Sequence, residues 1–333
     1  MSVITNKLFA DYNSNHIIMV HPSMYNDKNY YNDLIKIYTQ LNHIFIENNI
    51  KQTIVLDNKT NYSDFYHGNN FMSNVEILRY HCDDIWVRDF FPKLFTSADN
   101  KVMINYQFNA YGKKYNYLND NKFKEIFDFK VSSFDFEGIA LEGGNLEFSS
   151  RGVAITNLNS IKENNFMIST KDIERKFKEL KDRINIPELY MINVNNILGD
   201  DTNGHIDNLI RFINEDTIVY FASKDKNYCN YQVARNLEKE ISIIAKKSKI
   251  INNIIPIFHD ERDTFIKNNK IYPYSKLNFI ITKDIFIFPC LSNNYDQINN
   301  DIQSLSLRSM TYLLNTEAAL LENGGLHCLT ANI

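Results

Sequence analysis

The segment 201–212, DTNGHIDNLIRF, places a glycine, a histidine and an aspartate together in a chain that has only ten glycines. In an extended strand alternate side chains share one face, so His205 and Asp207 would point the same way, with Gly204 leaving open space beside them. A titratable base beside a carboxylate suits a catalytic pair, a metal site or an ordinary turn that enters a strand. The segment alone leaves these three interpretations open.

A second candidate for chemistry is Cys328, which ends the segment ENGGLHC. A Gly-Gly turn would present its thiol at the entrance of a strand, and a thiolate is a nucleophile when a base lies close by. His327 is adjacent, but in an extended chain neighbouring side chains point to opposite faces. We therefore expect the base to be His205 with Asp207, since Cys/His sites usually join distant residues. The alternative is a small buried cysteine without a chemical role.

A third candidate is the segment DDIWVRDFFP, which holds the only tryptophan, Trp86. Arg88 and Asp89 in it could form a surface ion pair beside a core tryptophan. They could equally belong to a carboxylate wall with an aromatic face, which suits a flat cation. Glu142, in the segment LEGGNLEF, would add another carboxylate to such a wall.

The glycines connect these candidates. Six of the ten lie in four short segments, FNAYGKKY, LEGGNLEF, TNGHIDN and ENGGLHC. Glycine costs conformational entropy and is best used where the backbone needs unusual dihedral angles or the close approach of a ligand. This concentration indicates one site built from distant segments.

The elements that must position this site alternate between strands and helices. Short β-type runs occur at 16–20, 52–56, 75–80, 101–108, 152–157 and 216–222, and a hairpin is predicted where LNFIIT and IFIFP flank residues 283–284. Apolar residues at helical spacing predict helices over 31–49, 171–184, 231–247 and 298–315. No Pro/Gly/Ser-rich linker interrupts this alternation, so we predict one α/β domain over residues 1–333.

Composition excludes several classes of protein. The 333 residues are 44% hydrophobic and 23% charged with a net charge of −4, which fits a globular protein and argues against nucleic acid as a partner. No apolar run approaches the roughly 20 residues of a membrane span, and the first residues lack the pattern of a signal peptide. The four cysteines are far apart, which argues against a disulfide framework or a structural zinc site. We expect a cytoplasmic protein with reduced thiols and no membrane partner.

Six segments in this order resemble the agmatine deiminases: DDIWVRDFFP, FNAYGKKY, LEGGNLEF, DDTNGHIDNLIRF, LNFIITKDIFIFP and NGGLHCLT. These enzymes belong to the guanidine-modifying superfamily, together with bacterial-type peptidylarginine deiminases. The resemblance runs from about residue 83 to residue 330. It implies the pentein fold, a five-bladed α/β propeller of ββαβ repeats around a central active site.

The resemblance also implies roles for single residues. Cys328 resembles the nucleophile, His205 the general acid/base, and Asp89 and Asp207 the carboxylates that hold the guanidinium group. The substrate-binding positions that it implies are Trp86, Glu142, Asn203, Asn278 and Gly325. The implied reaction converts agmatine and water to N-carbamoylputrescine and ammonia through a covalent thiouronium intermediate, without a metal or an organic cofactor. Deimination of peptidyl or free arginine, or of another guanidino amine, is the alternative, and a non-catalytic binding propeller is a third interpretation.

Asn203 departs from the family, which usually reads T-D-G-H where this chain reads T-N-G-H. In an extended segment Asn203 would share the face of His205 and line the pocket without offering a charge to the distal amine of agmatine. Asp200 or Asp201 could take over that role. The sequence leaves open the distal group of the substrate, a biosynthetic or catabolic role in polyamine and putrescine metabolism, and whether the protein forms a homo-oligomer.

Overall fold

The computed structural model describes residues 7–23, 28–60, 74–97, 100–127, 130–305, 307 and 309–333. Within them the strands form six sheets. The sheet β19-β2-β3-β4 contains Thr330–Asn332, His16–Val20, Lys51–Leu56 and Val75–Arg79. The sheet β1-β5-β6-β7 contains Lys7–Leu8, Leu94–Ser97, Asn100–Gln107 and Lys130–Ala140. The sheet β10-β9-β8 contains Glu188–Ile192, Val153–Asn157 and Leu146–Ser149.

The other sheets come from the second half of the chain. The sheet β11-β12-β13 contains Ile210–Phe212, Thr217–Ala222 and Asn253–Phe258. The sheet β16-β17-β18 contains Ile280–Ile281, Ile285–Cys290 and Met310–Asn315. The hairpin β14-β15 contains Phe265–Lys267 and Lys270–Tyr272.

Helices connect these strands. The α-helices are α1 (Lys28–Glu47), α2 (Val87–Phe90), α3 (Ala110–Lys113), α4 (Leu118–Lys122), α5 (Leu158–Asn164), α6 (Thr170–Arg183), α7 (Tyr231–Lys247), α8 (Tyr295–Ser304) and α9 (Glu317–Leu320). Short 3-10 helices are η1 (Asp11–Asn13), η3 (Phe123–Ile126), η4 (Gly143–Asn145), η5 (Ile206–Asn208) and η6 (Glu261–Asp263).

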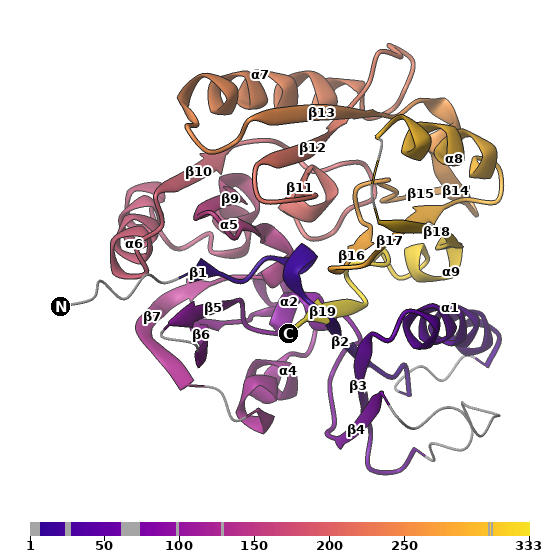
Figure 1. The fold of residues 1–333 in the computed structure, drawn as a ribbon, viewed down its shortest axis with the longest axis horizontal. Helices are drawn as coiled ribbons and strands as arrows, with labels where there is room; N and C mark the ends of the chain where they lie inside the picture. Colours follow the sequence, from indigo (N-terminus) through magenta and orange to yellow (C-terminus); the bar gives the residue numbers. More distant parts are fainter. Residues whose placement is uncertain are drawn as a thin grey trace.

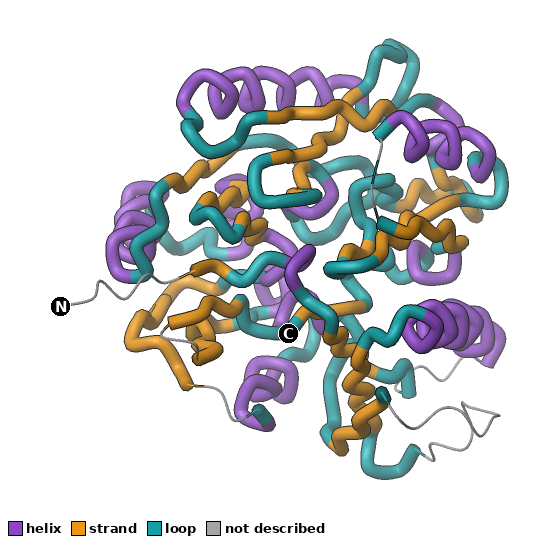
Figure 2. The backbone as a smooth tube through the Cα atoms, viewed as in Figure 1, coloured by secondary structure: helices purple, strands orange, loops and turns teal. Residues whose placement is uncertain are grey.

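One arrangement recurs in five of the six sheets that the described residues form: an antiparallel pair of strands followed by a parallel pair. A parallel pair needs a crossover connection, and helices α1, α4, α6, α7 and α8 lie in these connections. The recurring unit is therefore ββαβ, as the resemblance implies. Figure 1 shows the sheets set around the centre of the molecule, and Figure 2 shows helices outside them. Closure of the sheets into a propeller stays a prediction.

Most predicted elements are confirmed. The predicted strands correspond to β2, β3, β4, β6, β9 and β12, and the predicted hairpin is β16-β17. The predicted helix over 298–315 is wrong in its second half, because α8 ends at Ser304 and β18 begins at Met310. Strand β18 pairs with β17 along its whole length, from Met310 opposite Ile285 onward. Apolar spacing cannot separate helix from strand in such a short run, and the sheet neighbour decides.

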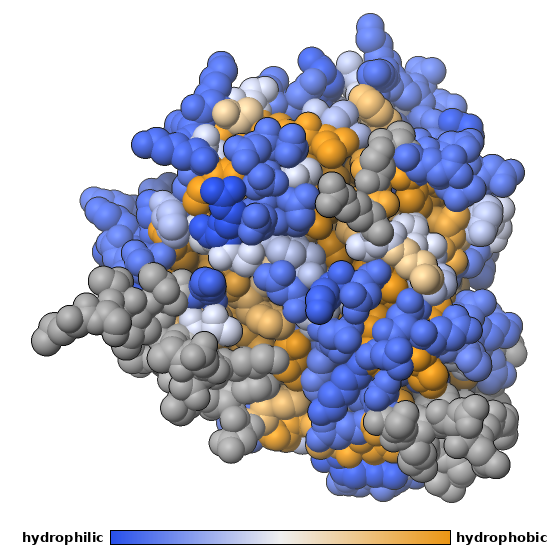
Figure 3. All heavy atoms as spheres, viewed as in Figure 1, coloured by the Kyte–Doolittle hydropathy of each residue, from blue (hydrophilic) through white to orange (hydrophobic). Residues whose placement is uncertain are grey.

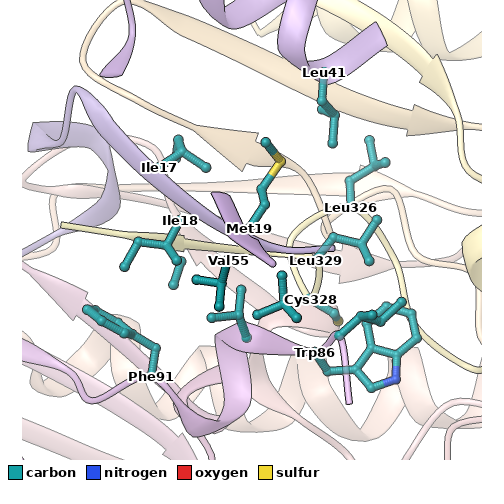
Figure 4. Close-up of a cluster of buried hydrophobic side chains, with 14 of the residues drawn as sticks. Ile17, Ile18, Met19, Leu41, Val55, Trp86, Phe91, Leu326, Cys328 and Leu329 are labelled. Atoms are coloured by element: carbon teal, nitrogen blue, oxygen red, sulfur yellow. The ribbon is translucent and has the colours of Figure 1, made fainter. Parts of the chain in front are cut away.

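The helices bury the faces that their apolar spacing predicts. The buried residues include Leu34, Tyr38, Leu41 and Phe45 of α1 and Ala234, Leu237, Ile241 and Ile244 of α7. Each fully buried aliphatic side chain stabilises the fold by roughly 1.5–3 kcal/mol before entropy is counted. Figure 4 shows one buried cluster, in which Trp86 and Cys328 lie among apolar side chains of β2 and β3. The cysteine and tryptophan singled out by the sequence thus belong to the edge of a core.

The surface is ordinary for a globular chain. Figure 3 shows hydrophilic residues over most of the visible face, with apolar residues in the gaps between them. Among the described residues, no helix is both long enough and apolar enough to cross a membrane.

Candidate active site

A cavity of about 370 Å³ leads from the surface to Cys328. Its innermost lining residues are buried: Trp86, Asp89, Tyr111 and Cys328 are each no more than 6% exposed. More exposed residues line its mouth: Asp83, Asp84, Tyr115, Asn116, Asp201, Glu322 and Asn323. Residues of the three candidate segments, 83–92, 201–212 and 322–328, therefore line one cavity.

Two glycines allow the turn that carries Cys328 to pack closely. A Cβ atom on Gly324 would overlap the ring of Trp86, and one on Gly325 would overlap the side-chain oxygen of Asn278. The amide nitrogen of Asn278 then lies 3.4 Å from the sulfur of Cys328. The sequence candidates Trp86 and Asn278 therefore both contact this turn. Gly324, rather than the predicted Gly325, lines the cavity.

The segment before His205 is a turn, so the alternation of side chains along an extended chain does not apply to it. Asn203 has φ +65° and Gly204 has φ +100°, and the 3-10 helix η5 begins directly after His205. Positive φ values suit asparagine and glycine better than other residues, which accounts for both residue types here. The backbone thus reaches the site by a different route from the one that the sequence pattern suggested.

His205, Asp207 and Asp89 nevertheless converge at one point, which lies over Gly144. A Cβ atom there would lie 2.6 Å from Oδ1 of Asp89, 2.7 Å from Nδ1 of His205 and 3.2 Å from Oδ2 of Asp207. Gly144 therefore provides the space in which these side chains meet. Its backbone N–H also donates a hydrogen bond to Asp89 Oδ1 at 3.0 Å.

Carboxylates surround the imidazole of His205. Its Nδ1 lies 3.4 Å from Asp89 Oδ1, and its Nε2 lies 3.8 Å from Glu142 Oε2. The hydroxyl of Tyr111 donates to the other oxygen of Asp89 at 2.7 Å. Tyr111 was not predicted as a site residue, although its segment, FNAYGKKY, stands out by its glycine.

Several buried polar atoms at this point have no hydrogen-bond partner among the described residues. They are both carboxylate oxygens of Glu142, both ring nitrogens of His205 and Oδ1 of Asp207. A buried polar atom without a partner costs about 1–3 kcal/mol, so such a group calls for an explanation. A planar cation with several N–H donors, such as a guanidinium ion, could satisfy the carboxylate oxygens together.

Burial and neighbouring charges set the protonation of the acid and the base. Burial raises the pKa of Asp89 to about 6, which the charge of His205 opposes and that of Asp207 reinforces. Burial also lowers the pKa of His205, but the carboxylates of Asp89 and Glu142 outweigh it and raise the value to about 10. The imidazole of His205 therefore carries a proton at neutral pH and can deliver it to a departing amine.

The surroundings of Cys328 oppose ionisation of its thiol. Burial is the largest cause that raises its pKa well above the usual range, and the charges of Asp207 and Asp89 add to the rise. A cation held between these carboxylates would cancel their effect on the sulfur.

His327, which the sequence reasoning set aside as a base, contacts Asp207 instead. Its Nδ1 lies 2.7 Å from Oδ2 of Asp207. Burial raises the pKa of Asp207, but this hydrogen bond and the charges of His327, His205 and Arg211 outweigh burial and lower it. His327 thus supports a site residue, and only the contact between distant segments shows this.

Asn203 lies outside the cavity lining. Its side-chain nitrogen donates to Oδ1 of Asn164 at 2.7 Å, and its side-chain oxygen lies 3.5 Å from Nζ of Lys114. The predicted contact of Asn203 with the substrate therefore has no support from its position. Asp201, which the sequence offered as a substitute, does line the cavity.

Comparison with known proteins places the chain in a family. The family model described as Porphyromonas-type peptidyl-arginine deiminase matches residues 11–333. The chain belongs to this family. A Vibrio parahaemolyticus protein named as a candidate agmatine deiminase is 26% identical over 288 residues, which cover 78% of this chain and 78% of that protein.

Solved structures confirm the fold of this deiminase family member. A cysteine-to-serine variant of the C. jejuni agmatine deiminase with substrate bound has a TM-score of 0.82 at 20% identity, covering 100% of this chain and 97% of that one. The agmatine deiminase of Enterococcus faecalis has a TM-score of 0.82 at 18% identity, covering 98% and 95%. The pentein-type α/β fold expected from the sequence is confirmed. Deiminases are hydrolases that act on C–N bonds.

The arrangement favours an organic cation over a metal ion. Among the described residues, no group of three or more His, Cys, Asp and Glu side chains has the geometry of a metal site. The donors that converge here are two or three carboxylates beside a protonated imidazole, and the imidazolium offers no lone pair to a metal.

The raised pKa of Asp89 predicts a pH dependence of cation binding. Because its pKa is raised from 3.8 to about 6, the anion is present above pH 6 and is lost as the pH falls through that value. In a Cys328→Ser variant, which removes thiol titration, the affinity for n-butylguanidine should fall below pH 6, approaching tenfold per pH unit. Calorimetry between pH 5 and 8 measures this, and Asp89→Asn in the same background should flatten the curve. A flat curve with Asp89 intact would contradict the assignment.

Proposed function

We propose that this chain is an agmatine deiminase, which hydrolyses the guanidinium group of agmatine to give N-carbamoylputrescine and ammonia. The observation that carries the proposal is that Asp89 and Cys328 line one cavity, while Asp89, His205 and Asp207 meet over Gly144 and the charges of Asp207 and Asp89 act on the Cys328 thiol. A nucleophile, two carboxylates and a protonated imidazole are the groups that this reaction requires.

Substrate binding comes first. The planar guanidinium ion would present its N–H groups to the free oxygen of Asp207 and to Asp89, in charge-assisted hydrogen bonds. Glu142, whose oxygens have no partner among the described residues, would accept a further N–H or hold the proton of His205 in place. The positive charge between the carboxylates then allows the thiol of Cys328 to release its proton to solvent in the cavity, from which it is regained when the product departs.

The chemical steps follow from this arrangement. The sulfur of Cys328 attacks the guanidinium carbon, and His205 donates its proton to the amino group that leaves as ammonia. The product of this half-reaction is a thiouronium adduct on Cys328. His205, now neutral, removes a proton from a water molecule that attacks the same carbon, the C–S bond breaks, and the ureido product departs. The C. jejuni neighbour holds substrate in a cysteine-to-serine variant, which supports a cysteine in this role.

The mouth of the cavity favours a second positive charge on the substrate. Asp83, Asp84, Asp201 and Glu322 line it, and the described residues that line the cavity include no lysine or arginine. The carboxylate of Asp201 is held there by the hydroxyl of Tyr115, at 2.8 Å. An amine at the far end of the substrate would be attracted, whereas the α-carboxylate of free arginine would be repelled.

The finer features of the fold belong to the same proposal. We infer that the five ββαβ units are the blades of a propeller around this site, and that residues 1–333 act as one catalytic domain. Support comes from the site itself, whose residues lie between Trp86 and Cys328 in the chain. A cytoplasmic location stays a prediction from the sequence.

The substrate assay tests the proposal directly. Wild-type protein should release ammonia from agmatine at least about tenfold more efficiently, in kcat/KM, than from free arginine, because a carboxylate at the acidic mouth is unfavourable by about 1.4 kcal/mol or more. A peptide that ends in arginine serves as the third substrate. Release from the peptide but not from agmatine would replace the proposal with a peptidyl-arginine deiminase.

The nucleophile is tested by substitution of single cysteines. Cys328→Ser should retain the fold and bind agmatine but lose essentially all turnover, because serine offers no comparable thiolate. Cys229→Ser and Cys290→Ser are controls that remove a thiol outside the cavity and should retain turnover. Peptide mass mapping after treatment with 2-chloroacetamidine should find the label on Cys328, and label on either control cysteine instead would refute the assignment.

The acidic mouth is tested at Asp201. Asp201→Asn should raise the KM for agmatine about fivefold, because a partly exposed charge contributes up to about 1 kcal/mol to binding. The kcat should change little, because the distal amine is bound equally well in the ground state and in the transition state. For n-butylguanidine, which lacks the amine, KM should stay within about twofold. Asp182→Asn, which removes an exposed acid from α6, is the matched control. Equal effects on both substrates would mean that the amine is bound elsewhere.

A further inference from the structure

Asp11, in the 3-10 helix η1, lies where three cationic or ionisable groups meet. Its Oδ2 lies 2.9 Å from Nε2 of His327, 3.1 Å from Nη1 of Arg88 and 3.4 Å from Nη2 of Arg211. Figure 1 shows the indigo chain after β1 running across the centre of the molecule. Asp11 precedes all the segments in which the sequence indicates site residues. Its contacts with Arg88, Arg211 and His327 hold this N-terminal turn in the interior.

His327 links Asp11 to the proposed substrate carboxylate Asp207. The ring nitrogens lie 2.9 Å from Asp11 and 2.7 Å from Asp207. Each contact at this distance needs a proton between nitrogen and oxygen, whereas a neutral imidazole has only one N–H. The three groups therefore share two protons and carry a net charge of −1, whichever of them holds the second proton.

The position of the second proton decides whether Asp207 is charged. On the imidazole it leaves both carboxylates ionised. On Asp207 it would neutralise the group that the proposed mechanism uses to hold the guanidinium ion, and the remaining oxygen of Asp207 would be a weaker acceptor. The competition between these two positions depends on the charges around His327.

The surroundings of His327 contain charges of both signs. Burial and the guanidinium groups of Arg211 and Arg88 lower the pKa of His327, whereas its hydrogen bonds to Asp11 and Asp207 raise it. Lys93 is also buried nearby, and Glu147 contacts Nε of Arg211 at 3.1 Å. Without an anion at Asp11, the two arginines would weaken the hold of His327 on the shared proton. Burial of Asp207 would then favour transfer of this proton to Asp207, against the charge of Arg211.

Asp11 is held as that anion. Burial raises its pKa, but Arg88, Lys93 and His327 outweigh burial and hold the value well below the usual range. The guanidinium groups are themselves fixed: Arg88 donates to Asn332 at 2.7 Å, and Arg211 donates to the carbonyl oxygen of Phe279 at 2.7 Å.

We propose that Asp11 is a positioning residue that acts through His327: it keeps the shared proton on the imidazole and so leaves Asp207 ionised and oriented toward the substrate. The inference rests on the proposed function for the role of Asp207, but its geometry does not. Asp11 does not contact the substrate. It acts indirectly, through the contact between His327 and Asp207.

A purely structural role for Asp11, as a counter-ion to two buried arginines, is the competing explanation. Glu147→Gln is the matched control for it, because Glu147 also neutralises Arg211 from a buried position but has no contact with His327. Loss of either carboxylate should lower the melting temperature. Only the loss of Asp11 should change the charge of Asp207, which a bound cation would contact.

The test compares two reagents that differ in charge alone, the cation 2-chloroacetamidine and the neutral 2-chloroacetamide. The ratio of their rates of alkylation of Cys328 reports the attraction of the site for an amidinium group, and it needs no turnover. Asp11→Asn should lower this ratio about tenfold and lower kcat/KM for agmatine about a hundredfold. Glu147→Gln should leave the ratio within about twofold of the wild-type value. Equal ratios in the two variants would overturn the proposal.

A second variant covers the case in which Asp11→Asn fails to fold. His327→Gln leaves Asp11 beside Arg88 and Arg211 but cuts the connection to Asp207, and it should lower the ratio about tenfold as well. An unchanged ratio in His327→Gln would overturn the proposal. Absence of ammonia release from agmatine by the wild-type protein would refute the proposed function alone, since the alkylation ratio still measures the charge at Asp207.

Discussion

The burial of carboxylates is the constraint on which the rest of this structure depends. Asp89, Glu142 and Asp207 are each no more than 1% exposed and lie around one imidazole. The desolvation of a charged carboxylate costs several kcal/mol even after the protein relaxes, so each must be compensated by a cation or by hydrogen-bond donors. Donors come from Tyr111 and the Gly144 backbone for Asp89, and from His327 for Asp207.

The buried carboxylates near Arg88 and Arg211 have cationic partners, whereas those around His205 are only partly compensated. Behind the site, Arg211 and Arg88 donate to carboxylates and carbonyl oxygens on several sides. In front, the oxygens of Glu142 and one oxygen of Asp207 have no partner among the described residues. A guanidinium ion would supply the donors that these oxygens lack. The charges of Asp207 and Asp89 also raise the pKa of the Cys328 thiol.

The sequence predicts the residues that line the cavity better than the buried network of Asp11 and His327. Glycine is informative because it marks places where side chains of other residues must meet, and Gly144 and Gly324 lie at two such places. Cys328 and Asp89 could therefore be found from local patterns. Asp11 and His327 could not, because a buried network between distant segments leaves no periodic signal in any one of them.

Local backbone geometry was the other limit of sequence reasoning. His-x-Asp spacing indicated two side chains that do approach each other, but through a different backbone, because a strand and a 3-10 turn can both bring positions two apart to one place. The same ambiguity misplaced Asn203, whose positive φ turns its amide toward Asn164. Composition and periodicity predicted only the α/β class. The resemblance to a family predicted the fold and its ββαβ repeat.

The topology makes the position of Cys328 depend on segments near both ends of the chain. Strand β19, which begins two residues after Cys328, pairs with β2 in antiparallel register, Thr330 opposite Met19. The C-terminal strand thus completes the sheet that the N-terminal segment begins, and Asp11 joins the same region through Arg88 and His327. Cys328 and Asp89 line one cavity although they lie far apart in the chain, so bringing them together has a loop-closure cost. The pairing of β19 with β2 offsets this cost by fixing the segment after Cys328 in the sheet of the N-terminal segment, which local helix formation alone cannot achieve.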